Sequence, residues 1–308
     1  MMEVIAEQGN EELAKIYVAS MRGSSEYLVE FVESIQPPIP REKKWVLIVS
    51  TLFGCPIKCK MCDAGGTYRG KLTKDEILEE IDFMVKRRFP DRNIPISKFK
   101  IQFARMGDPF LNIDVINVLE QLPHIYDAPG LIPSISTVAP KNTFDFFNKL
   151  TEVKNRYYSD GKFQLQFSIH TSDLNKRNEL IPIKKMDFSE IAQCGNKFYQ
   201  PGDQKITLNF AMGKGYPVDA GIIRKFFNPE YFIIKLTPIN PTESAKKNNI
   251  ISEIDASDPT SADHIVNDFK SEGFDVILSI GEQKENYIGS NCGQFITQIM
   301  DSKITSIN

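Results

Sequence analysis

The stretch WVLIVSTLFGCPIKCKMC, residues 45–62, decides the fold of this chain. Its first part, residues 45–51, is a run of apolar and β-branched side chains that is typical of a strand buried on both faces. Directly afterwards come Cys55, Cys59 and Cys62, spaced C-x3-C-x2-C. The glycine, proline and lysine residues around them indicate a loop. The sequence therefore predicts a buried strand that ends in a loop carrying three thiols.

Strand and helix patterns alternate along most of the remaining chain. The expected strands lie at 99–105, 134–138, 163–170, 206–212, 231–237 and 274–280. The expected helices lie at 73–88, 113–122, 142–153, 173–180, 187–198, 218–227 and 261–272. Short connections between alternating elements indicate a parallel sheet with right-handed crossovers. We therefore expect an α/β fold, a partly open (β/α)6-type barrel, with a doubly wound open sheet as the alternative. In either fold the active site belongs at the carboxyl ends of the strands.

The first 40 residues differ from the rest in charge and pattern. They hold seven acidic and two basic residues, and apolar stretches at 15–21 and 26–33 flank a turn at 22–25. Three prolines at positions 37, 38 and 40 end this unit. We expect a small N-terminal β-hairpin extension over residues 1–40, and a core domain over residues 41–308 that carries Cys292 near its end.

The overall composition is that of an ordinary globular protein. Hydrophobic residues make up 41% and charged residues 25%, which excludes general disorder. A net charge of −3 and a pI of about 5.8 argue against a protein whose main role is to bind the phosphate backbone of nucleic acids. No apolar run approaches the length of a transmembrane helix, and the acidic N-terminus lacks a signal-peptide pattern. We therefore expect a cytoplasmic protein without a membrane partner.

Five cysteines are an odd number, and three of them lie within eight residues. Without a signal peptide, such clustering favours a metal or iron–sulfur centre over disulfides. A cubane cluster needs four ligands, so three local thiolates leave one iron with an open position, as in a catalytic metal site. Two other interpretations stay open: buried small apolar side chains, and a zinc site.

The spacing of Cys55, Cys59 and Cys62 resembles the cluster motif of the radical S-adenosylmethionine (SAM) superfamily. Over residues 26–295, further segments resemble the radical SAM adenine methylases of RNA, the RlmN/Cfr type, in matching order. These segments are STLFGC at 50–55, MGDPFLN at 106–112, IST at 135–137, SIH at 168–170, Arg177 with LIPI at 180–183, TPINP at 237–241 and NCGQ at 291–294.

The resemblance implies two cofactors, a 4Fe-4S cluster on the three cysteines and SAM bound through the open iron. It implies SAM contacts from Gly107, Asp108, Ser136, Ser168, His170 and Asn240. It further implies Cys292 as a methyl carrier, Glu30 as a proton acceptor, and an external electron donor such as flavodoxin or ferredoxin. On the residues alone, Asp108 and the serines are also ordinary caps, His170 a structural histidine, Asn240 a turn residue and Glu30 an exposed strand carboxylate.

Several departures from the family point away from a large RNA substrate. Ile48 stands where the family has its resolving cysteine, and the stretch before Cys292 lacks the family's arginines. The front of the chain is acidic, and we expect no separate RNA-binding domain ahead of the core. We therefore expect a radical SAM methyl or methylene transferase that uses Cys292 on a small molecule. The alternatives are an RNA adenine methyltransferase of the RlmN/Cfr type, radical chemistry without methyl transfer, and a non-catalytic metal-binding protein.

Overall fold

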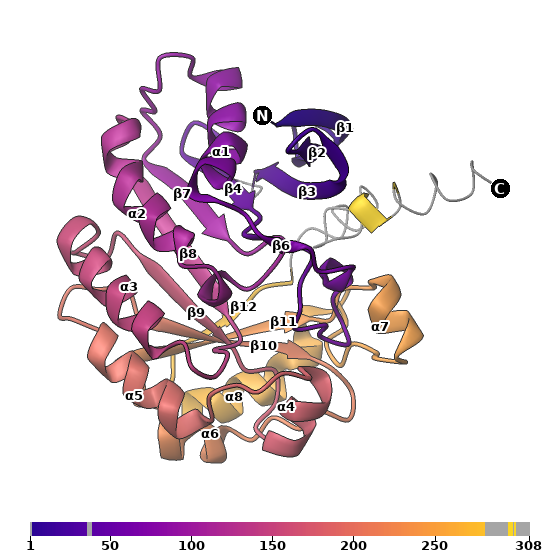
Figure 1. Cartoon of the computed structure of the whole chain (residues 1–308). Helices are drawn as coiled ribbons and strands as arrows, with labels where there is room; N and C mark the ends of the chain where they lie inside the picture. The colour runs from indigo at the N-terminus through magenta and orange to yellow at the C-terminus, as the bar shows by residue number, and fades with distance from the viewer. Residues whose placement is uncertain (1, 36–38, 281–294, 298, 300–308) are drawn as a thin grey trace. The chain divides into compact units, whose positions relative to one another are not determined.

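The computed structural model describes residues 2–35, 39–280, 295–297 and 299. Contacts divide the chain into two compact units. Unit 1 comprises residues 1–58, 62–135 and 284–308, and unit 2 comprises residues 59–61 and 136–283. Both units combine strands with helices (Figure 1). Within the described residues, no helix is both long and apolar enough to cross a bilayer.

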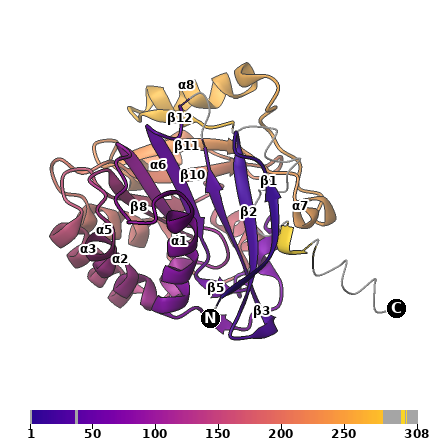
Figure 2. The same ribbon diagram turned by 90° about the horizontal axis from the view of Figure 1, so that it is seen from above.

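Unit 1 is built on a sheet that is antiparallel in its first half and parallel in its second. Its strands are β1 (Glu3–Gly9), β2 (Ala14–Met21), β3 (Ser24–Ser34), β4 (Lys44–Val49), β7 (Lys98–Phe103) and β8 (Leu131–Thr137), the last two residues of β8 belonging to unit 2. β1, β2 and β3 lie side by side (Figure 2), and β3 pairs antiparallel with β4, where Val32 stands opposite Ile48. β4, β7 and β8 are parallel. A short separate pair, β5 (Leu52–Phe53) with β6 (Gly70–Lys71), follows β4.

Two helices of unit 1 accompany the parallel strands. α1 (Lys74–Arg88) packs against α2 (Asp114–Ile125) and also contacts β4 (Figure 1). Thr73 begins α1 with a capping box, because its hydroxyl accepts the amide of Glu76 while the Glu76 carboxylate accepts the amide of Thr73. This arrangement confirms the predicted start of the helix. Two short 3-10 turns, η1 (Asp63–Gly65) and η2 (Pro109–Leu111), follow the cysteine loop and β7.

Unit 2 holds four parallel strands. They are β9 (Gln164–Ser168), β10 (Ile206–Met212), β11 (Phe232–Pro238) and β12 (Val276–Leu278), in that order across the sheet. The helices are α3 (Phe144–Tyr157), α4 (Leu174–Leu180), α5 (Phe188–Phe198), α6 (Ala220–Phe226), α7 (Glu243–Lys247) and α8 (Asp263–Ser271), with a 3-10 turn η3 (Pro259–Ala262) before α8. α3 packs with α5, α5 with α6, and α6 with α8 (Figure 1).

The two faces of the unit 2 sheet differ in polarity. Residues in register on neighbouring parallel strands share a face, and alternate residues of one strand lie on opposite faces. One face carries fully buried apolar side chains, such as Phe167, Leu208 and Ile234. The opposite face carries the polar side chains of Gln166, Ser168, Thr207, Asn209, Lys235 and Thr237. One face of these strands is therefore packed with apolar side chains, and the opposite face, which also carries Ala211 and Ile233, is mostly polar and suited to a ligand.

The predicted α/β class is confirmed, since both units contain parallel strands connected through helices, and neither unit closes into a barrel over the described residues. Each predicted core strand and helix is present close to its predicted place, and β10 spans the predicted residues. The predicted N-terminal hairpin is present, with a turn at Arg22 and Gly23, which both have positive φ. The sequence analysis missed β1, the β5–β6 pair and α7. The domain boundary at residue 40 stays a prediction.

A buried arginine ties together three backbone carbonyls of unit 2. The Arg177 side chain is 1% exposed. Its guanidinium donates to the carbonyl oxygens of Met186, Val138 and Ser168 at 2.8, 3.0 and 3.3 Å. Because Val138 and Ser168 follow or end β8 and β9, one side chain fixes two strand ends.

We expect Arg177→Met to lower the free energy of unfolding by about 3 kcal/mol, because three buried carbonyls lose a charged donor. Lys176→Met, next to it on α4, is the matched control, since Lys176 makes a surface ion pair with Glu179 and little change is expected there. Urea unfolding of both variants measures the difference. Equal free energies of unfolding in the two variants would show that the hydrogen bonds of Arg177 to these carbonyls do not stabilise the fold.

α1 carries a carboxyl group into the core of unit 1. The Glu80 side chain is fully buried; its Oε2 accepts the Ser50 amide at 2.8 Å, and its Oε1 has no hydrogen-bond partner in the described part of the chain. Burial raises the pKa of Glu80 well above its usual value, against the Ser50 hydrogen bond, which lowers it. Glu76 on the same helix behaves oppositely: burial raises its pKa, but hydrogen bonds from Arg22 and Thr73 outweigh this and the net pKa is lowered.

We expect Glu80→Gln to gain stability relative to the wild type as pH rises. A raised folded-state pKa stabilises the wild type below the unfolded pKa of about 4.3, and this contribution is lost as pH rises toward the folded pKa. Glutamine keeps an oxygen for Ser50 and does not titrate. Glu76→Gln is the control of opposite sign, because a lowered pKa stabilises the wild type above the unfolded value. Urea unfolding from about pH 4 to pH 8 measures both trends. A Glu80→Gln difference that does not vary with pH would show that folding does not raise the pKa of Glu80.

Candidate active site

The start of the cysteine loop is held by the segment that follows β7, within unit 1. The carbonyl oxygen of Met106 accepts the amides of Thr51 and Leu52 at 2.8 and 3.1 Å. The Met106 amide donates to the Ser50 hydroxyl at 3.2 Å, and this hydroxyl donates to the Glu30 carbonyl on β3 at 2.6 Å. The carboxyl ends of β4 and β7 are thereby locked to each other and to β3 just before Cys55.

Two glycines let backbone segments approach closely around this loop. Gly54 has a φ of +70°, and a Cβ there would lie 2.5 Å from the carbonyl oxygen of Thr67. Gly107 has a φ of +89°, and a Cβ there would lie 2.3 Å from Cγ of Leu52. Both positions require glycine. Gly107, which is predicted to contact SAM, is therefore also required for the close approach of its backbone to Leu52.

Cys55 lies at the buried start of the motif. Burial raises the pKa of its thiol to about 12, while hydrogen bonds from the backbone amides of Ile57 and Lys58 lower it and the nearby Cys62 and Asp108 raise it. Two amide donors aimed at one sulfur suit a metal-bound thiolate better than a neutral thiol. The surroundings of Cys55 therefore favour metal ligation over simple packing.

The thiols of this loop are donors of the kind that hold iron–sulfur clusters. Over the residues that the structure describes, no three His, Cys, Asp or Glu side chains converge on the position of one metal ion. A cubane cluster needs no such convergence, because its thiolates bind different irons. Cys55 is buried, whereas Cys59 and Cys62 are partly exposed, and Cys62 packs against apolar side chains of unit 1.

The middle of the cysteine loop, Cys59–Met61, belongs to unit 2. The Lys60 amide donates to the carbonyl of Leu180 at 2.9 Å, and the Lys60 carbonyl accepts the side-chain amide of Asn248 at 2.9 Å. The Met61 carbonyl accepts the hydroxyl of Thr242 at 2.9 Å. The end of α4 and both ends of α7 thus hold the backbone beside Cys59.

Asp108 follows β7 and caps η2. Its side chain is mostly buried, and its Oδ1 accepts the amide of Phe110 at 2.9 Å. The capping role that the sequence left open is therefore present. The carboxylate also lies close enough to Cys55 to raise the pKa of that thiol. Asp108 thus combines a capping contact with a position beside the first cysteine.

His170 follows β9 with its backbone in the left-handed region, at a φ of 67°, which is uncommon for a residue other than glycine. Its Nδ1 accepts the amide of Ala211 on β10 at 3.0 Å, so the neutral ring carries its proton on Nε2. Burial lowers the pKa of His170 to about 3, and the charge of Arg177 contributes in the same direction. His170 is therefore a neutral N–H donor at a strand end.

Two of the predicted SAM contacts lie on the polar face of unit 2. The Ser136 hydroxyl accepts from the Gln166 side chain at 3.2 Å, and Ser168 stands opposite Asn209 in register. Asn240 lies after β11 and is exposed; its carbonyl accepts the amide of Thr242 at 2.8 Å.

Asn209 is a candidate that the sequence analysis missed. Its side chain is 9% exposed, and its Oδ1 has no hydrogen-bond partner in the part of the chain that the structure describes. A buried acceptor without a donor is costly, so this oxygen is suited to a ligand or a water molecule. The available signal was one amide side chain inside the run Ile206–Met212, whose other residues are apolar except Thr207.

Cys292 and Glu30 are the two residues predicted to perform the chemistry, and the structure describes only the second. Cys292 lies outside the described residues. Glu30 is not the exposed strand carboxylate considered from the sequence, because it is fully buried on β3, pairs with Arg105 and accepts the amide of Ile296 at 2.7 Å. Its role as a proton acceptor stays a prediction.

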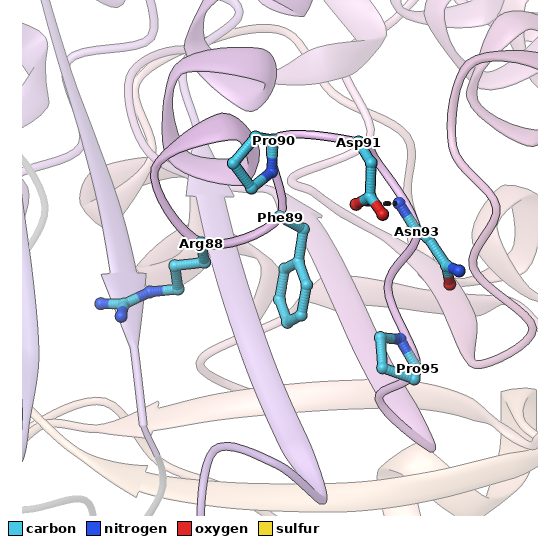
Figure 3. A pocket seen from close by; sticks show the side chains of 6 residues that line it. All are labelled: Arg88, Phe89, Pro90, Asp91, Asn93 and Pro95. Atoms are coloured by element: carbon cyan, nitrogen blue, oxygen red, sulfur yellow. Dashed lines mark hydrogen bonds between the residues drawn. The ribbon is translucent and has the colours of Figure 1, made fainter.

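A pocket of about 420 Å³ lies between the end of α1 and the start of β7, in unit 1 (Figure 3). Its lining consists of Arg88, Phe89, Pro90, Asp91, Asn93 and Pro95. The pocket lies near the amino end of a parallel strand, whereas ligands of open α/β sheets bind at the carboxyl ends. We therefore do not assign the active site to it.

Several curated proteins are similar to the chain in sequence. A probable dual-specificity RNA methyltransferase RlmN of Prochlorococcus marinus (strain MIT 9515) is 28% identical over 180 residues, which are 58% of this chain and 49% of that protein. A protein of the same description from Chlorobium phaeobacteroides (strain BS1) is 25% identical over 283 residues, which are 85% of this chain and 73% of that protein. The chain spans about half the length of the first curated relatives it matches, 49% and 52%. No protein-family model matches the chain.

Among solved structures, a radical SAM methyltransferase from Sphaerobacter thermophilus superposes with a TM-score of 0.71 at 17% identity, covering 95% of this chain and 80% of that one. This likeness confirms the predicted fold class. The relatives imply the predicted cofactors, a 4Fe-4S cluster and SAM. The chain is thus similar in sequence to RlmN RNA methyltransferases and similar in fold to a radical SAM methyltransferase.

Proposed function

We propose that this chain is a radical SAM methyltransferase that holds a 4Fe-4S cluster on Cys55, Cys59 and Cys62. The surroundings of Cys55 carry the proposal, because this buried thiol follows the end of β4 and receives two backbone amides. The names of the sequence relatives and the likeness in fold support the same chemistry. When bound, the cluster and SAM supply an electron and a cleavable sulfonium, and hence a carbon radical that removes hydrogen atoms.

The side chains at the strand ends would bind and orient SAM. Asp108 accepts hydrogen bonds from the ammonium group of SAM, beside the glycine at position 107. The hydroxyls of Ser136 and Ser168 hold the carboxylate and the ribose. His170 donates through Nε2 without adding charge, since burial keeps it neutral. Asn240 binds the ribose or the adenine, and the Oδ1 of Asn209 is a further acceptor on the polar face.

Cys292 is the proposed methyl carrier. Its thiolate attacks the methyl group of SAM, the sulfonium S–C bond breaks as the new S–C bond forms, and S-adenosylhomocysteine leaves. Removal of a hydrogen atom from the S-methyl group would leave an S-methylene radical that forms a carbon–carbon bond with the substrate, and the substrate would then stay joined to Cys292 until the bond between sulfur and methylene breaks. The family resembled here releases its product with a second thiol, and that position is Ile48, which packs among apolar side chains of unit 1. Release in this chain therefore needs another route.

We propose a small molecule as the substrate. The net charge of −3 and the acidic first 40 residues give no excess of cations for a phosphate backbone. The isoleucine at position 48 also removes the step by which the family frees a methylated adenine. RNA methylation is the second candidate, because the sequence relatives are named as RNA methyltransferases.

We expect the anaerobically reconstituted chain to release 5′-deoxyadenosine from SAM when dithionite supplies electrons. Replacing Cys55, Cys59 or Cys62 with alanine removes a cluster ligand and should abolish this product. Cys194→Ala is the control, since Cys194 is buried on α5 beside Met186 and serves packing. Chromatography of the products measures the effect. Release that persists in all three ligand variants would end the proposal.

We expect SAM with a deuterated methyl group to label Cys292 first, and then a component of a small-molecule extract. Cys292→Ala removes the acceptor sulfur and should abolish both labels. Mass spectrometry of peptides, of the extract and of ribosomal and transfer RNA locates the label. An unlabelled Cys292 would refute the carrier role while sparing the radical chemistry. Labelled adenine in RNA would replace the small-molecule substrate with the second candidate.

A further inference from the structure

The Glu30 carboxylate is divided between two partners on different segments of unit 1. Its Oε1 pairs with the guanidinium of Arg105, which follows β7, and both side chains are nearly or fully buried. Its Oε2 accepts the amide of Ile296 at 2.7 Å. Glu30 thus connects β3 with a segment near the C-terminus, far away in sequence.

The same segment docks through apolar side chains. Phe295 and Ile296 are 9% and 4% exposed. They belong to a cluster with Ala14, Ile16, Val18, Leu28, Val32, Ala64 and Met106, against which Ile48, Cys62 and Ile299 also pack. Side chains of β2 and β3 therefore form much of the apolar surface on which Phe295 and Ile296 pack. Cys62, the third cysteine of the motif, packs against the same cluster.

We propose that Glu30, charge-balanced by Arg105, is a positioning residue that anchors the C-terminal segment at Ile296. The apolar contacts give the segment affinity for the sheet but little choice of register, since hydrophobic contact is non-directional. A hydrogen bond from a backbone amide to a buried side-chain oxygen is directional, because it weakens steeply away from linear geometry. The guanidinium of Arg105 pairs with Oε1 of Glu30, so Oε2 faces the amide of Ile296.

The anchor is itself joined to the cysteine loop. The backbone carbonyl of Glu30 accepts the Ser50 hydroxyl, and Ser50 also receives the amide of Met106. The residue that fixes Ile296 is therefore fixed by the same contacts that hold the loop before Cys55. This inference goes beyond the proposed function, because none of its contacts involves a cofactor.

Glu33 provides a matched control on the same strand. It is also buried, and its carboxylate binds Arg88 at 2.6 and 2.8 Å, the Tyr17 hydroxyl at 2.8 Å and the Trp45 indole at 3.2 Å. Because residues 30 and 33 of a strand point to opposite faces, Glu33 lies on the side away from Ile296. Loss of its charge perturbs the same strand without touching the anchor.

The test is hydrogen exchange at residues 295–299 in the full chain. Glu30→Met with Arg105→Met removes the acceptor and its counter-charge together, and should speed exchange there roughly tenfold. Glu30→Gln with Arg105→Met keeps an uncharged acceptor, and should stay close to the wild type although it cannot act as a base. Glu33→Gln should leave exchange at these residues unchanged. Exchange that is unchanged in the first variant, or equally fast in the first two, would overturn the anchor.

An amide-to-ester change at Ile296 tests the same contact from the other side, should the buried substitutions prevent folding. Cys292 is a natural ligation junction, so a synthetic peptide covering residues 292–308 can be joined to residues 1–291 with or without the ester. The ester removes the N–H that Glu30 accepts, and it also makes the carbonyl oxygen of residue 295 a weaker acceptor. We expect exchange at residues 297 and 299 to be roughly tenfold faster in the ester form. Equal exchange in the two forms would refute the proposal.

Discussion

The proposed site depends on the contacts of Ser50, the first residue after β4. Its hydroxyl joins the Glu30 carbonyl to the Met106 amide, and its own amide is held by the buried Glu80 on α1. One residue thus fixes β3, α1 and the segment after β7 to the backbone that leads into Cys55. In a buried network such as this, each member depends on the others, because an unpaired group in the low-dielectric interior is costly. The cysteine loop begins from a rigid point for that reason.

The chemistry available to the two units is different in kind. Unit 1 supplies the buried thiol of Cys55 with its two amide donors, and the carboxylate of Asp108 close to it. Unit 2 supplies the imidazole of His170, whose pKa burial lowers to about 3, and a polar sheet face that carries hydroxyl and amide side chains together with Lys235. Arg177, the buried cation nearby, is occupied with backbone carbonyls.

Local signals in the sequence predicted most of the core and the cysteine loop. Three such signals are the capping box at Thr73, the mostly apolar run of β10 and the spacing of the three cysteines. Each depends only on residues that are close together in the chain, so it does not require knowledge of tertiary contacts. β1 was missed because its residues alternate between exposed and half-buried, and it becomes a strand through pairing with β2. The β5–β6 pair has only two residues in each strand and is made by a contact across the loop.

Buried polar groups were the main failure of sequence reasoning, for a physical reason. The pattern around Glu30 is the same whether this carboxylate meets water or the guanidinium of Arg105, which comes from a distant segment. The burial of Glu80 and the unpartnered oxygen of Asn209 likewise depend on tertiary packing that no local spacing records. Residues whose role is set by a distant partner therefore had to be found in the structure.

The account depends most directly on what the three thiols bind. The measurement that tests this is metal and sulfide analysis of anaerobically purified protein, together with the electron paramagnetic resonance spectrum of its reduced form with and without SAM. The account predicts about four iron and four sulfide per chain and a spectrum that changes when SAM is added, because SAM occupies the open iron. Zinc on the thiols, or an iron signal that SAM leaves unchanged, would contradict it.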